Sequence, residues 1–597
     1  MNVAEGHEHP GKSPIRIANC SGFYGDRVGA ALEMVEGGPI DVLTGDWLAE
    51  LTMLILARTK AKHPGGGYAR TFVTQMEQVM GQCLDEGIKV VSNAGGLDPD
   101  HCAEAVAEVA AKLGLSPTIA FVNGDNVLPR LVELRAAGVD LIDYETGDPV
   151  PDIDYISANA YLGGWGIVEA LDRGADIVIT GRATDAAIVC GPAAWHHGWS
   201  RADFDQLAGA VVAGHVIECG TQACGGNYSF FTELPGMDRV GFPIAEIAAD
   251  GSSVITKHVG TGGAVTVGTV TSQLLYEIGS PAYLGPDVTS RFDTIALKQV
   301  GTDRVQISNV QGEQPPATLK VSMNSWAGFR SDISVALTGL DIDAKAELIE
   351  DIFWRYCPYG PDDFDSVTAT TVRTDHADPE TNERAVALWR ITVKDRDQAK
   401  TKSVATSQNN MALASIPGFF GLKGGGIAKP FGVHTSGLIS ADLVPQYVTL
   451  LGGDKTVVDS TISTVASASE VHAVVPGMPA PAHGTATVAP LGEIVGARSG
   501  DKGGNANLGV FARSAEVYSW LEHNVSVEKL RELLPEASEL RIERYLLPNL
   551  WSINFVIHGL LQEGVAASTR LDGQAKSLGE WFRARHMEIP VALLLDD

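Results

Sequence analysis

One repeated pattern, from Ile15 to about residue 191, constrains the fold of this chain more than any other feature. An apolar segment runs into a polar turn that contains glycine, and a segment with helical spacing of apolar residues follows. The successive units are IRIANC–SGFYGDR, DVLTGDW, IKVVSNAGG, TIAFVNGDN, SANAYLGGW and ADIVITGRATD. Near-continuous apolar strands that alternate with helices predict an α/β fold, with a parallel sheet in Rossmann-like layering.

The polar turns of this pattern predict a ligand site. Right-handed crossovers place them all at the carboxyl edge of the sheet, which is where open α/β sheets bind ligands. Each residue taken singly is also an ordinary turn or cap residue, and only the repetition favours a crevice. The residues expected to converge there are Asp26, Arg27, Asp46, Asn93, Asp125, Asn159, Arg182 and Asp185, and Gly95 is added as a substrate-binding residue.

Composition excludes several classes of function. The 597 residues carry 44 basic against 73 acidic side chains, a formal charge of −29, so binding to nucleic acid or an anionic membrane surface is not expected. The seven scattered cysteines do not form a disulfide framework and suit a reducing compartment. The first residues lack an apolar signal core and the apolar runs are too short to span a bilayer, so we expect a cytoplasmic protein.

Cofactor motifs are missing from the sequence. No GxGxxG opens a first βαβ unit and no GxxxxGK[ST] occurs, which disfavours NAD, FAD and P-loop nucleotides. There is no HExxH, and the adjacent His196 and His197 do not share a helix face. We therefore expect no metal.

The stretch VITKHVGTGGAVT, residues 254–266, is a first candidate anion loop. A glycine turn that opens a helix presents unpaired N–H groups and the positive end of the helix dipole. The alternative is a tight hairpin or helix-entry turn. The residues proposed for the site are Lys257, His258, Thr261, Gly262 and Gly263.

Residues 204–232 predict a helix that ends in a glycine-rich loop. Glu218 near its end is a candidate general base, Cys219 a candidate nucleophile, and Asn227 a binding residue beyond them. The alternative for Cys219 is a small residue buried beside glycines.

The remaining patterns divide the chain. We expect the sheet domain at 1–284, an α+β domain of half-exposed antiparallel strands at 285–471, and a Pro/Ala/Gly linker at 472–489. Residues 490–597 mix strands and helices in an order that suits a ferredoxin-like α+β sandwich.

A second candidate anion loop lies between the first two strands of that last domain. Basic side chains among glycines suit a nest for a phosphate or carboxylate, and the alternative is a hairpin in which Asp501 pairs with Lys502. The residues are Arg498, Ser499, Asp501, Lys502, Gly503 and Asn505.

Long stretches of the chain resemble one family. SGFYGDR, LTGDWLAELTMLILAR, NAGGLDP, TGRATDAAIVCGPAAWHHGW, GGNYSFFTE and KHVGTGGAVTVGTVTSQLLYEI resemble the acyclic terpene utilisation protein AtuA, and ARSGDKGGNANLGV resembles its ferredoxin-like C-terminal module. The resemblance implies catabolism of branched acyl-CoA esters of the citronellol or geraniol type, alongside geranyl-CoA carboxylation. Coenzyme A would then enter as part of the substrate, with no other cofactor.

Three functions follow from these patterns. The first is a hydratase or lyase that uses Asp185 and Glu218 as acid and base, while Arg182, Lys257 and His258 position the thioester. The second is a thioester hydrolase or transferase with a covalent intermediate on Cys219 or Glu218. The third is a non-catalytic subunit of an acyl-CoA carboxylase complex. We also expect a homo-oligomer and association with proteins of the carboxylase pathway.

Overall fold

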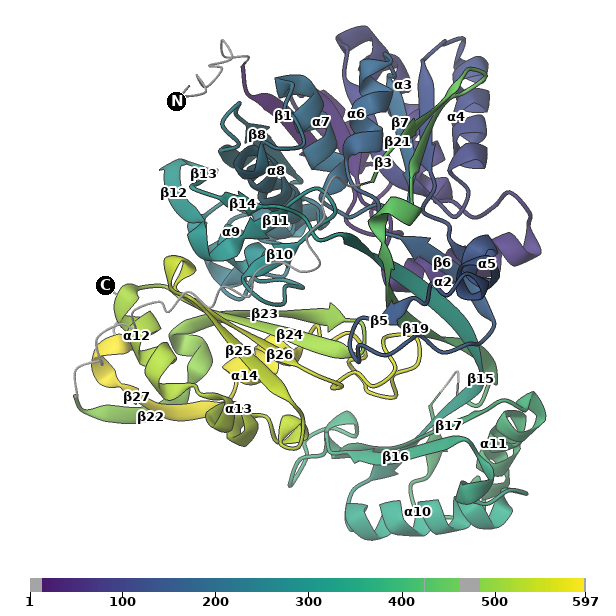
Figure 1. The fold of residues 1–597 in the computed structure, drawn as a ribbon. Coiled ribbons are helices and arrows are strands. Elements are labelled where there is room, and N and C mark those ends of the chain that lie inside the picture. Colours follow the sequence, from purple (N-terminus) through teal and green to yellow (C-terminus); the bar gives the residue numbers. More distant parts are fainter. Residues whose placement is uncertain (1–12, 423–424, 461–483, 595–597) are drawn as a thin grey trace. The chain divides into compact units, whose positions relative to one another are not determined.

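The computed structural model describes residues 13–422, 425–460 and 484–594 (Figure 1). The chain forms two compact units. The first comprises the chain up to Met323, His434–Val565 and the segment from Gln574 onward; the second comprises Asn324–Val433 and Ala566–Gly573. Most of the expected linker, residues 472–483, lies outside the described residues.

A large mixed sheet forms the centre of the first unit, and its order is β12-β13-β9-β8-β1-β2-β3-β7-β4-β20-β21. Its parallel strands are β1 (Ile15–Asn19), β2 (Val42–Gly45), β3 (Lys89–Gly96), β7 (Ile177–Gly181) and β4 (Ile119–Asn123). Antiparallel strands extend both edges: β8 (Pro243–Ile247), β9 (Ser253–Lys257), β13 (Arg304–Ser308) and β12 (Ala296–Gly301) on one side, β20 (Gln446–Leu450) and β21 (Lys455–Val458) on the other.

Helices cover both faces of this sheet. Successive strand residues alternate between two separate cores: Ile17 and Val42 belong to one, whereas Ala18 and Leu43 belong to the other. This is why the strands read as continuous apolar runs. The helices are α1 (Ala30–Glu36), α2 (Glu50–Lys62), α3 (Arg70–Glu86), α4 (Pro99–Leu113), α5 (Leu131–Ala136), α6 (Trp165–Asp172), α7 (Ala187–His197), α8 (Phe204–Ile217) and α9 (Val267–Leu274). The α/β prediction is confirmed.

One unit of the repeated pattern does not join the parallel strands. β6 (Tyr155–Ala160), the strand in SANAYLGGW, pairs with β15 (Thr318–Thr338) instead. Expecting it in the parallel sheet was wrong, because an apolar run does not specify its partner strand. Isolated bridges Asn126↔Asn159 and Leu162↔Ala183 still hold its carboxyl end beside the carboxyl edge of the large sheet.

The C-terminal module has its own four-stranded antiparallel sheet, in the order β23-β24-β26-β25. These strands are β23 (Val495–Lys502), β24 (Asn505–Ala512), β26 (Ser552–Ile557) and β25 (Ile542–Leu547), and the helices are α12 (Ala515–Asn524), α13 (Val527–Leu533) and α14 (Leu578–Arg583). A separate strand pair, β22 (Ala486–Pro490) and β27 (His586–Pro590), also belongs to it. The predicted ferredoxin-like domain is confirmed, and most of it lies in the same compact unit as the large sheet.

The second unit is an α+β body. Within it β15 pairs with β17 (Val386–Asp395), which pairs with β16 (Ser366–Val372), and α10 (Ile342–Tyr356) and α11 (Gln398–Met411) accompany them. Its core includes Ile333, Phe353 and Trp389. The expected span of 285–471 is wider than this unit, because β12, β13, β20 and β21 pair with strands of the large sheet.

The remaining strands are short or connect the larger elements: β5 (Ile142–Asp143), β10 (Ala282–Leu284), β11 (Thr289–Arg291), β14 (Gln311–Glu313), β18 (Phe420–Gly421) and β19 (Lys429–Ser440). Among the helices that the structure describes, none is long and apolar enough to cross a membrane.

Candidate functional site

Three carboxyl groups meet at the carboxyl edge of the large sheet. Asp46 follows β2, Asp185 lies in the turn after β7, and Glu218 caps the end of α8. Each contributes an oxygen, and these oxygens lie within 4.8 Å of one another. Asn19 at the end of β1 fixes the end of α8, because its amide donates to the Ile217 and Glu218 carbonyls at 2.7 and 2.8 Å. We call Asp46, Asp185 and Glu218 the carboxylate cluster.

Arg182 supplies the positive charge beside this cluster. Its Nη1 lies 3.2 Å from Asp185 Oδ1 and donates to the Leu48 carbonyl at 3.0 Å. Its guanidinium also lies 4.1 Å from the centre of the Tyr161 ring. Only 3% of the Arg182 side chain is exposed, so the charge is stabilised by these contacts rather than by water.

Amide side chains hold the turns in place. Asn93 Nδ2 donates to Asp46 Oδ1 at 2.5 Å, and its oxygen accepts from the Trp47 N–H at 2.8 Å. Asp125 accepts from Asn159 Nδ2 at 2.6 Å and from the Arg182 N–H at 3.0 Å. The strand-end residues Asp46, Asn93, Arg182 and Asp185 are therefore brought together, with Asp125 and Asn159 fixing the turn beneath Arg182.

Burial and mutual repulsion favour the protonated form of the cluster. Burial, reinforced by the charge of Asp185, raises the pKa of Asp46 to about 8. Burial also raises the pKa of Asp185, and it raises the pKa of Glu218 well above the ordinary value, where Asp185 and Asp46 add to the effect. One guanidinium cannot compensate the two buried carboxylates of Asp46 and Glu218 and the partly buried one of Asp185, so the cluster retains protons at neutral pH.

His215 lies next to Glu218, with Nδ1 3.6 Å from Glu218 Oε1. Burial lowers its pKa to about 4, so the imidazole is neutral at pH 7. It packs against Tyr283 and Phe292, which fits the role of a packed histidine. Oxygen atoms at the spacing of the carboxylate cluster also suit a divalent cation, and the expectation of no metal stays a prediction.

A fourth carboxylate, Glu277, lies just beyond α9, and the C-terminal module holds its backbone in place. Its backbone is left-handed, with φ of 57°, which is uncommon outside glycine. Asn507 on β24 accepts from the Glu277 N–H at 2.8 Å and donates to the Leu275 carbonyl at 3.0 Å. Asn554 on β26 donates to the Ile278 and Gly279 carbonyls at 3.1 and 2.7 Å.

Lys576 links Glu277 to the module. Its Nζ lies 3.2 Å from Glu277 Oε1 and 3.0 Å from Asp501 Oδ1, and it donates to the Tyr276 hydroxyl. The Glu277 charge acts to raise the pKa of both Asp185 and Glu218. The module therefore contributes to this site from the same chain.

A further ion pair lies beside the site. Lys320 Nζ donates to Glu50 Oε1 at 3.0 Å, and His434 Nδ1 lies 3.7 Å from Glu50 Oε2. Although burial acts to raise it, His434 and Lys320 together hold the pKa of Glu50 well below its usual range. Lys320 Nζ also lies 5.2 Å from the centre of the Tyr161 ring, the same ring against which the Arg182 guanidinium lies.

Most backbone donors of the first candidate anion loop are already used within the fold. The N–H groups of residues 261–264 donate to protein carbonyls, those of His258, Arg239, Pro235 and Cys224 respectively. The helix that follows begins at Val267 with Thr266 as its N-cap, so the loop is not the helix N-terminus. The alternative, a tight structural turn, is what the structure has.

Lys257 and His258 are likewise used within the fold. Lys257 Nζ donates to the Thr261 carbonyl at 2.8 Å and lies 3.1 Å from Asp303 Oδ2. His258 Nε2 lies 2.9 Å from the Met34 carbonyl. Among the described residues no hydrogen bond or ion pair joins either side chain to the carboxylate cluster, and the roles assigned to Lys257, His258, Thr261, Gly262 and Gly263 find no support in this geometry.

Other expected binding residues have structural contacts. Asp26 accepts from the Gly22 and Arg27 N–H groups at 2.9 and 2.8 Å, and Arg27 pairs with Glu33 at 2.6 Å. A Cβ on Gly95 would meet the Thr180 carbonyl at 2.5 Å, so this glycine permits close packing of β3 on β7. Asn227 is an exposed turn residue with φ of 58°.

The second candidate anion loop is a hairpin. β23 and β24 pair in register from Val495↔Ala512 to Lys502↔Asn505, so the turn contains only Gly503 and Gly504, with φ of 63° at Gly503. Its backbone is therefore engaged in the ladder and does not form a nest. The hairpin alternative is confirmed except for the Asp501 pairing, since Asp501 contacts Lys576 and not Lys502.

The side chains of this hairpin differ in role. Ser499 Oγ donates to the Ala575 carbonyl at 2.6 Å and accepts from the Gly579 N–H at 2.9 Å, a structural contact. Asn505 donates to Glu145 at 2.8 Å and accepts from the Gly559 N–H at 2.9 Å. Arg498 bonds Gln222 and lies 4.3 Å from the centre of the Tyr276 ring. Lys502 Nζ donates to the Glu277 carbonyl at 3.4 Å.

Cys219 lies next to Glu218 and is only partly exposed. Burial, together with the charges of Glu218 and Glu277, raises the pKa of its thiol well above the ordinary value. A nucleophilic cysteine needs the opposite environment, in which positive charge lowers the pKa.

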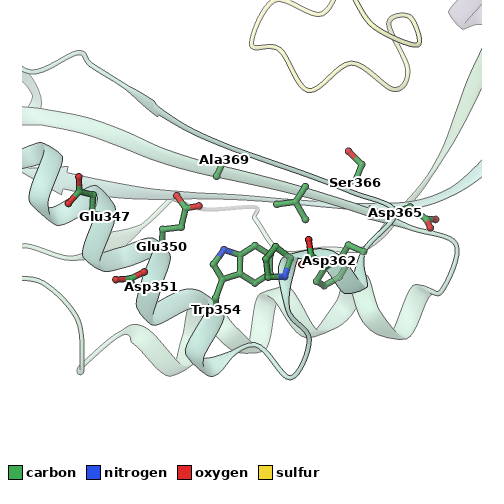
Figure 2. Close-up of a pocket in the computed structure, with 11 residues that line it drawn as sticks. Glu347, Glu350, Asp351, Trp354, Asp362, Asp365, Ser366 and Ala369 are labelled. Atoms are coloured by element: carbon green, nitrogen blue, oxygen red, sulfur yellow. The ribbon is translucent and has the colours of Figure 1, made fainter.

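A wide cavity of about 860 Å³ opens in the second unit (Figure 2). It is lined by Trp354 and by acidic side chains of α10 and of the turn after it, including Glu350, Asp351 and Asp362. None of the residues expected from the sequence lines it. The carboxylate cluster, with buried groups of both charges, is better suited to chemistry.

Several residues of the site were missed by sequence reasoning: Glu50, Tyr161, Glu277, Lys320, His434, Asn507, Asn554 and Lys576. One signal could have found the asparagines. Asn507 and Asn554 each stand among mostly apolar neighbours, in NANLGV and WSINFV. Because a buried amide needs hydrogen-bond partners, such positions indicate a specific contact.

These observations define an α/β protein with a titratable polar site at the carboxyl edge of its sheet, to which a ferredoxin-like module contributes. The chain belongs to the AtuA family of acyclic terpene utilisation proteins, and the model of this family matches residues 15–450. The AtuA ferredoxin-like domain matches residues 489–588. No curated protein and no solved structure matches the chain. The family is implicated in acyclic terpene utilisation.

Proposed function

We propose that this protein is an enzyme that performs acid–base chemistry of the hydratase or lyase type on a branched acyl-CoA ester derived from an acyclic terpene or a related acid. The observation that carries the proposal is the carboxylate cluster, three carboxyl groups with oxygens within 4.8 Å and raised pKa values beside a buried arginine. General acid–base catalysis requires one group that is protonated and one that is ionised at the working pH, and two titratable groups in different environments provide this pair.

The contacts of the cluster suggest a division of roles. Arg182, 3.2 Å from Asp185, favours the ionised form of Asp185, which would act as base. Among the described residues no lysine or arginine forms an ion pair with Glu218, and burial outweighs the more distant charge of Arg182, so Glu218 would remain protonated, as the acid. In hydration of an α,β-unsaturated thioester, Asp185 takes a proton from a water molecule while the oxygen of that water bonds to the β-carbon. The π electrons move to the thioester oxygen, and the enolate re-forms the carbonyl as the α-carbon takes the proton of Glu218.

The positive groups would act on the thioester. Arg182, which acts electrostatically on the cluster, replaces Lys257 and His258 as the group that polarises the thioester, and Lys320 and Lys502 would orient the rest of the substrate. This chemistry needs no cofactor beyond the coenzyme A of the substrate. A cytoplasmic location, a homo-oligomeric state and association with carboxylase pathway proteins remain predictions.

The test is incubation of the full chain with a panel of branched acyl-CoA esters in deuterated water, followed by mass spectrometry. We expect deuterium at the α-carbon, and a loss of about 100-fold or more in Asp185→Asn and in Glu218→Gln. Asp140→Asn, at an exposed position, is the matched control. Wild-type rates in both cluster variants would overturn the roles of Asp185 as base and Glu218 as acid. If the wild type reacts with none of the esters, the non-catalytic alternative is favoured.

The covalent alternative is tested in the same experiment. Cys219→Ala should retain activity, because the wild-type thiol is protonated at neutral pH. An acyl adduct on Cys219 or Glu218 in the intact-mass spectrum would instead support the hydrolase or transferase.

A further inference from the structure

Lys502, at the end of β23, carries an ammonium group with unused hydrogen-bond capacity. The single hydrogen bond found for its Nζ among the described residues is the one of 3.4 Å to the Glu277 carbonyl. An ammonium has three donors, so at least two are available to a ligand. The side chain is partly exposed, which leaves it accessible.

The carboxylates that act on Lys502 are already engaged with other groups. Those are Glu277, Glu50 and Glu145. Glu277 pairs with Lys576 at 3.2 Å, Glu50 with Lys320 at 3.0 Å, and Glu145 accepts from Asn505 at 2.8 Å. Among the residues that the structure describes, Lys502 therefore has no carboxylate of its own, although it lies in a protein with a formal charge of −29.

A second lysine, Lys320, acts electrostatically on Lys502. Burial and the charge of Lys320 both lower the pKa of Lys502. The Lys320 side chain remains 29% exposed, so a ligand can reach it as well. Lys320 is paired with Glu50 at 3.0 Å, and its charge would still attract an anion that binds to the unused donors of Lys502.

We propose that Lys502, together with Lys320, forms an anion subsite beside the carboxylate cluster, which takes an oxyanion of the substrate. The oxyanion is a carboxylate at the far end of the acyl group or a phosphate of coenzyme A. The acyl-CoA identity of the ligand rests on the proposed function, whereas the subsite itself rests on the lysine contacts. The backbone of the Lys502 hairpin is occupied by the strand ladder, so the recognition is by side chains.

Calorimetry on the full chain with two matched pairs of ligands tests this subsite. Glutaryl-CoA and pentanoyl-CoA have acyl chains of equal length with and without a terminal carboxylate, and CoA and dephospho-CoA differ by the 3′-phosphate. We expect the wild type to bind one anionic member at least about tenfold more tightly than its partner. If Lys502→Met loses the preference in the first pair, the subsite binds the acyl carboxylate. If it loses the preference in the second pair, the subsite binds the 3′-phosphate.

Controls separate the subsite from general damage. Lys502→Arg should keep the preference, and so should Lys529→Met, which removes a lysine of α13 paired with Glu532. Lys502→Met should melt at an unchanged or higher temperature, because it removes a partly buried charge that has only one hydrogen bond among the described residues. Should Lys502→Met fail to fold, Lys320→Gln, which keeps a donor for Glu50, should weaken the same preference.

The proposal is overturned if the wild type shows no preference in either pair, or if Lys502→Met or Lys320→Gln keeps the wild-type preference. These measurements need no turnover. If the binding preference depends on Lys502 but no ester takes up deuterium, the proposed enzyme function is refuted and the subsite is still supported.

Discussion

The Asn507 side chain accepts a hydrogen bond from the backbone N–H of Glu277 at 2.8 Å, across 230 residues of sequence. Through this contact the ferredoxin-like module holds a carboxylate of the large unit in a left-handed backbone conformation. Strained residues of this kind persist only where the surroundings determine them, and they concentrate at functional sites. The module is therefore part of the site, and its asparagines are open to direct test.

Replacing Asn507 by alanine should lower the free energy of unfolding by about 2–5 kcal/mol. The change leaves the Glu277 N–H and the Leu275 carbonyl without their partner in a buried position. Chemical denaturation measures the difference. The control is Asn524→Ala on α12, which removes one hydrogen bond within a helix and should cost about 1 kcal/mol. Equal effects of the two substitutions would contradict the role given to Asn507.

Glu277→Gly should be more stable than Glu277→Ala by about 1 kcal/mol. Both variants lose the carboxylate, but only glycine adopts a φ of 57° without steric cost. Thermal melting of the two variants isolates the backbone contribution. If Glu277 also contacts the substrate, both variants lose activity equally. A glycine variant no more stable than the alanine variant would show that the backbone at this position is not strained.

The free energy of unfolding should decrease as the pH rises from about 4 to about 8, because Asp46 loses its proton in this range. Its pKa is about 8 in the folded state and roughly 4 in the unfolded chain, so the folded state binds more protons in this window. Unfolding free energy then decreases as the pH rises, and the stabilisation by the bound proton is complete only below about pH 4. The effect should amount to roughly 2–5 kcal/mol across the window.

Asp46→Asn measures this contribution. Its stability relative to the wild type should increase as the pH rises from 4 to 8, because the neutral amide does not titrate. The amide oxygen can still accept from Asn93 and the Leu48 N–H, which limits other effects. For the exposed Asp140→Asn the difference from wild type should stay within about 0.5 kcal/mol. A flat difference for Asp46→Asn would place its pKa near the ordinary value.

Lys257→Met should lower stability by about 1–3 kcal/mol and leave acyl-CoA affinity unchanged. Lys257 is 4% exposed and pairs with Asp303, so its removal leaves a partly buried carboxylate without a cation. Denaturation and calorimetry on the same variant give both quantities. Weaker acyl-CoA binding at wild-type stability would restore Lys257 to the site.

Much of the carboxyl edge could be predicted from the sequence. Glycine turns after apolar strands place Asp46, Asn93, Arg182 and Asp185 at one edge, because crossovers between parallel strands have one hand. Glu218 was found from its position at the end of a helix before glycines. By contrast, Lys257 and His258 have the residue types of an anion loop, but the N–H groups beside them are satisfied by Arg239, Pro235 and Cys224. Sequence spacing does not reveal such partners.

The sequence alone determined the layered α/β core, the ferredoxin-like module and the family, because strand and helix periodicities and long motifs are local properties. Only the tertiary structure decided which charges meet. Lys576 reaches Glu277 over 299 residues, and Asn507 reaches the same residue over 230. Such contacts depend on how separately folded layers pack, and the pKa values of the site depend in turn on that packing, since burial and neighbouring charge set them.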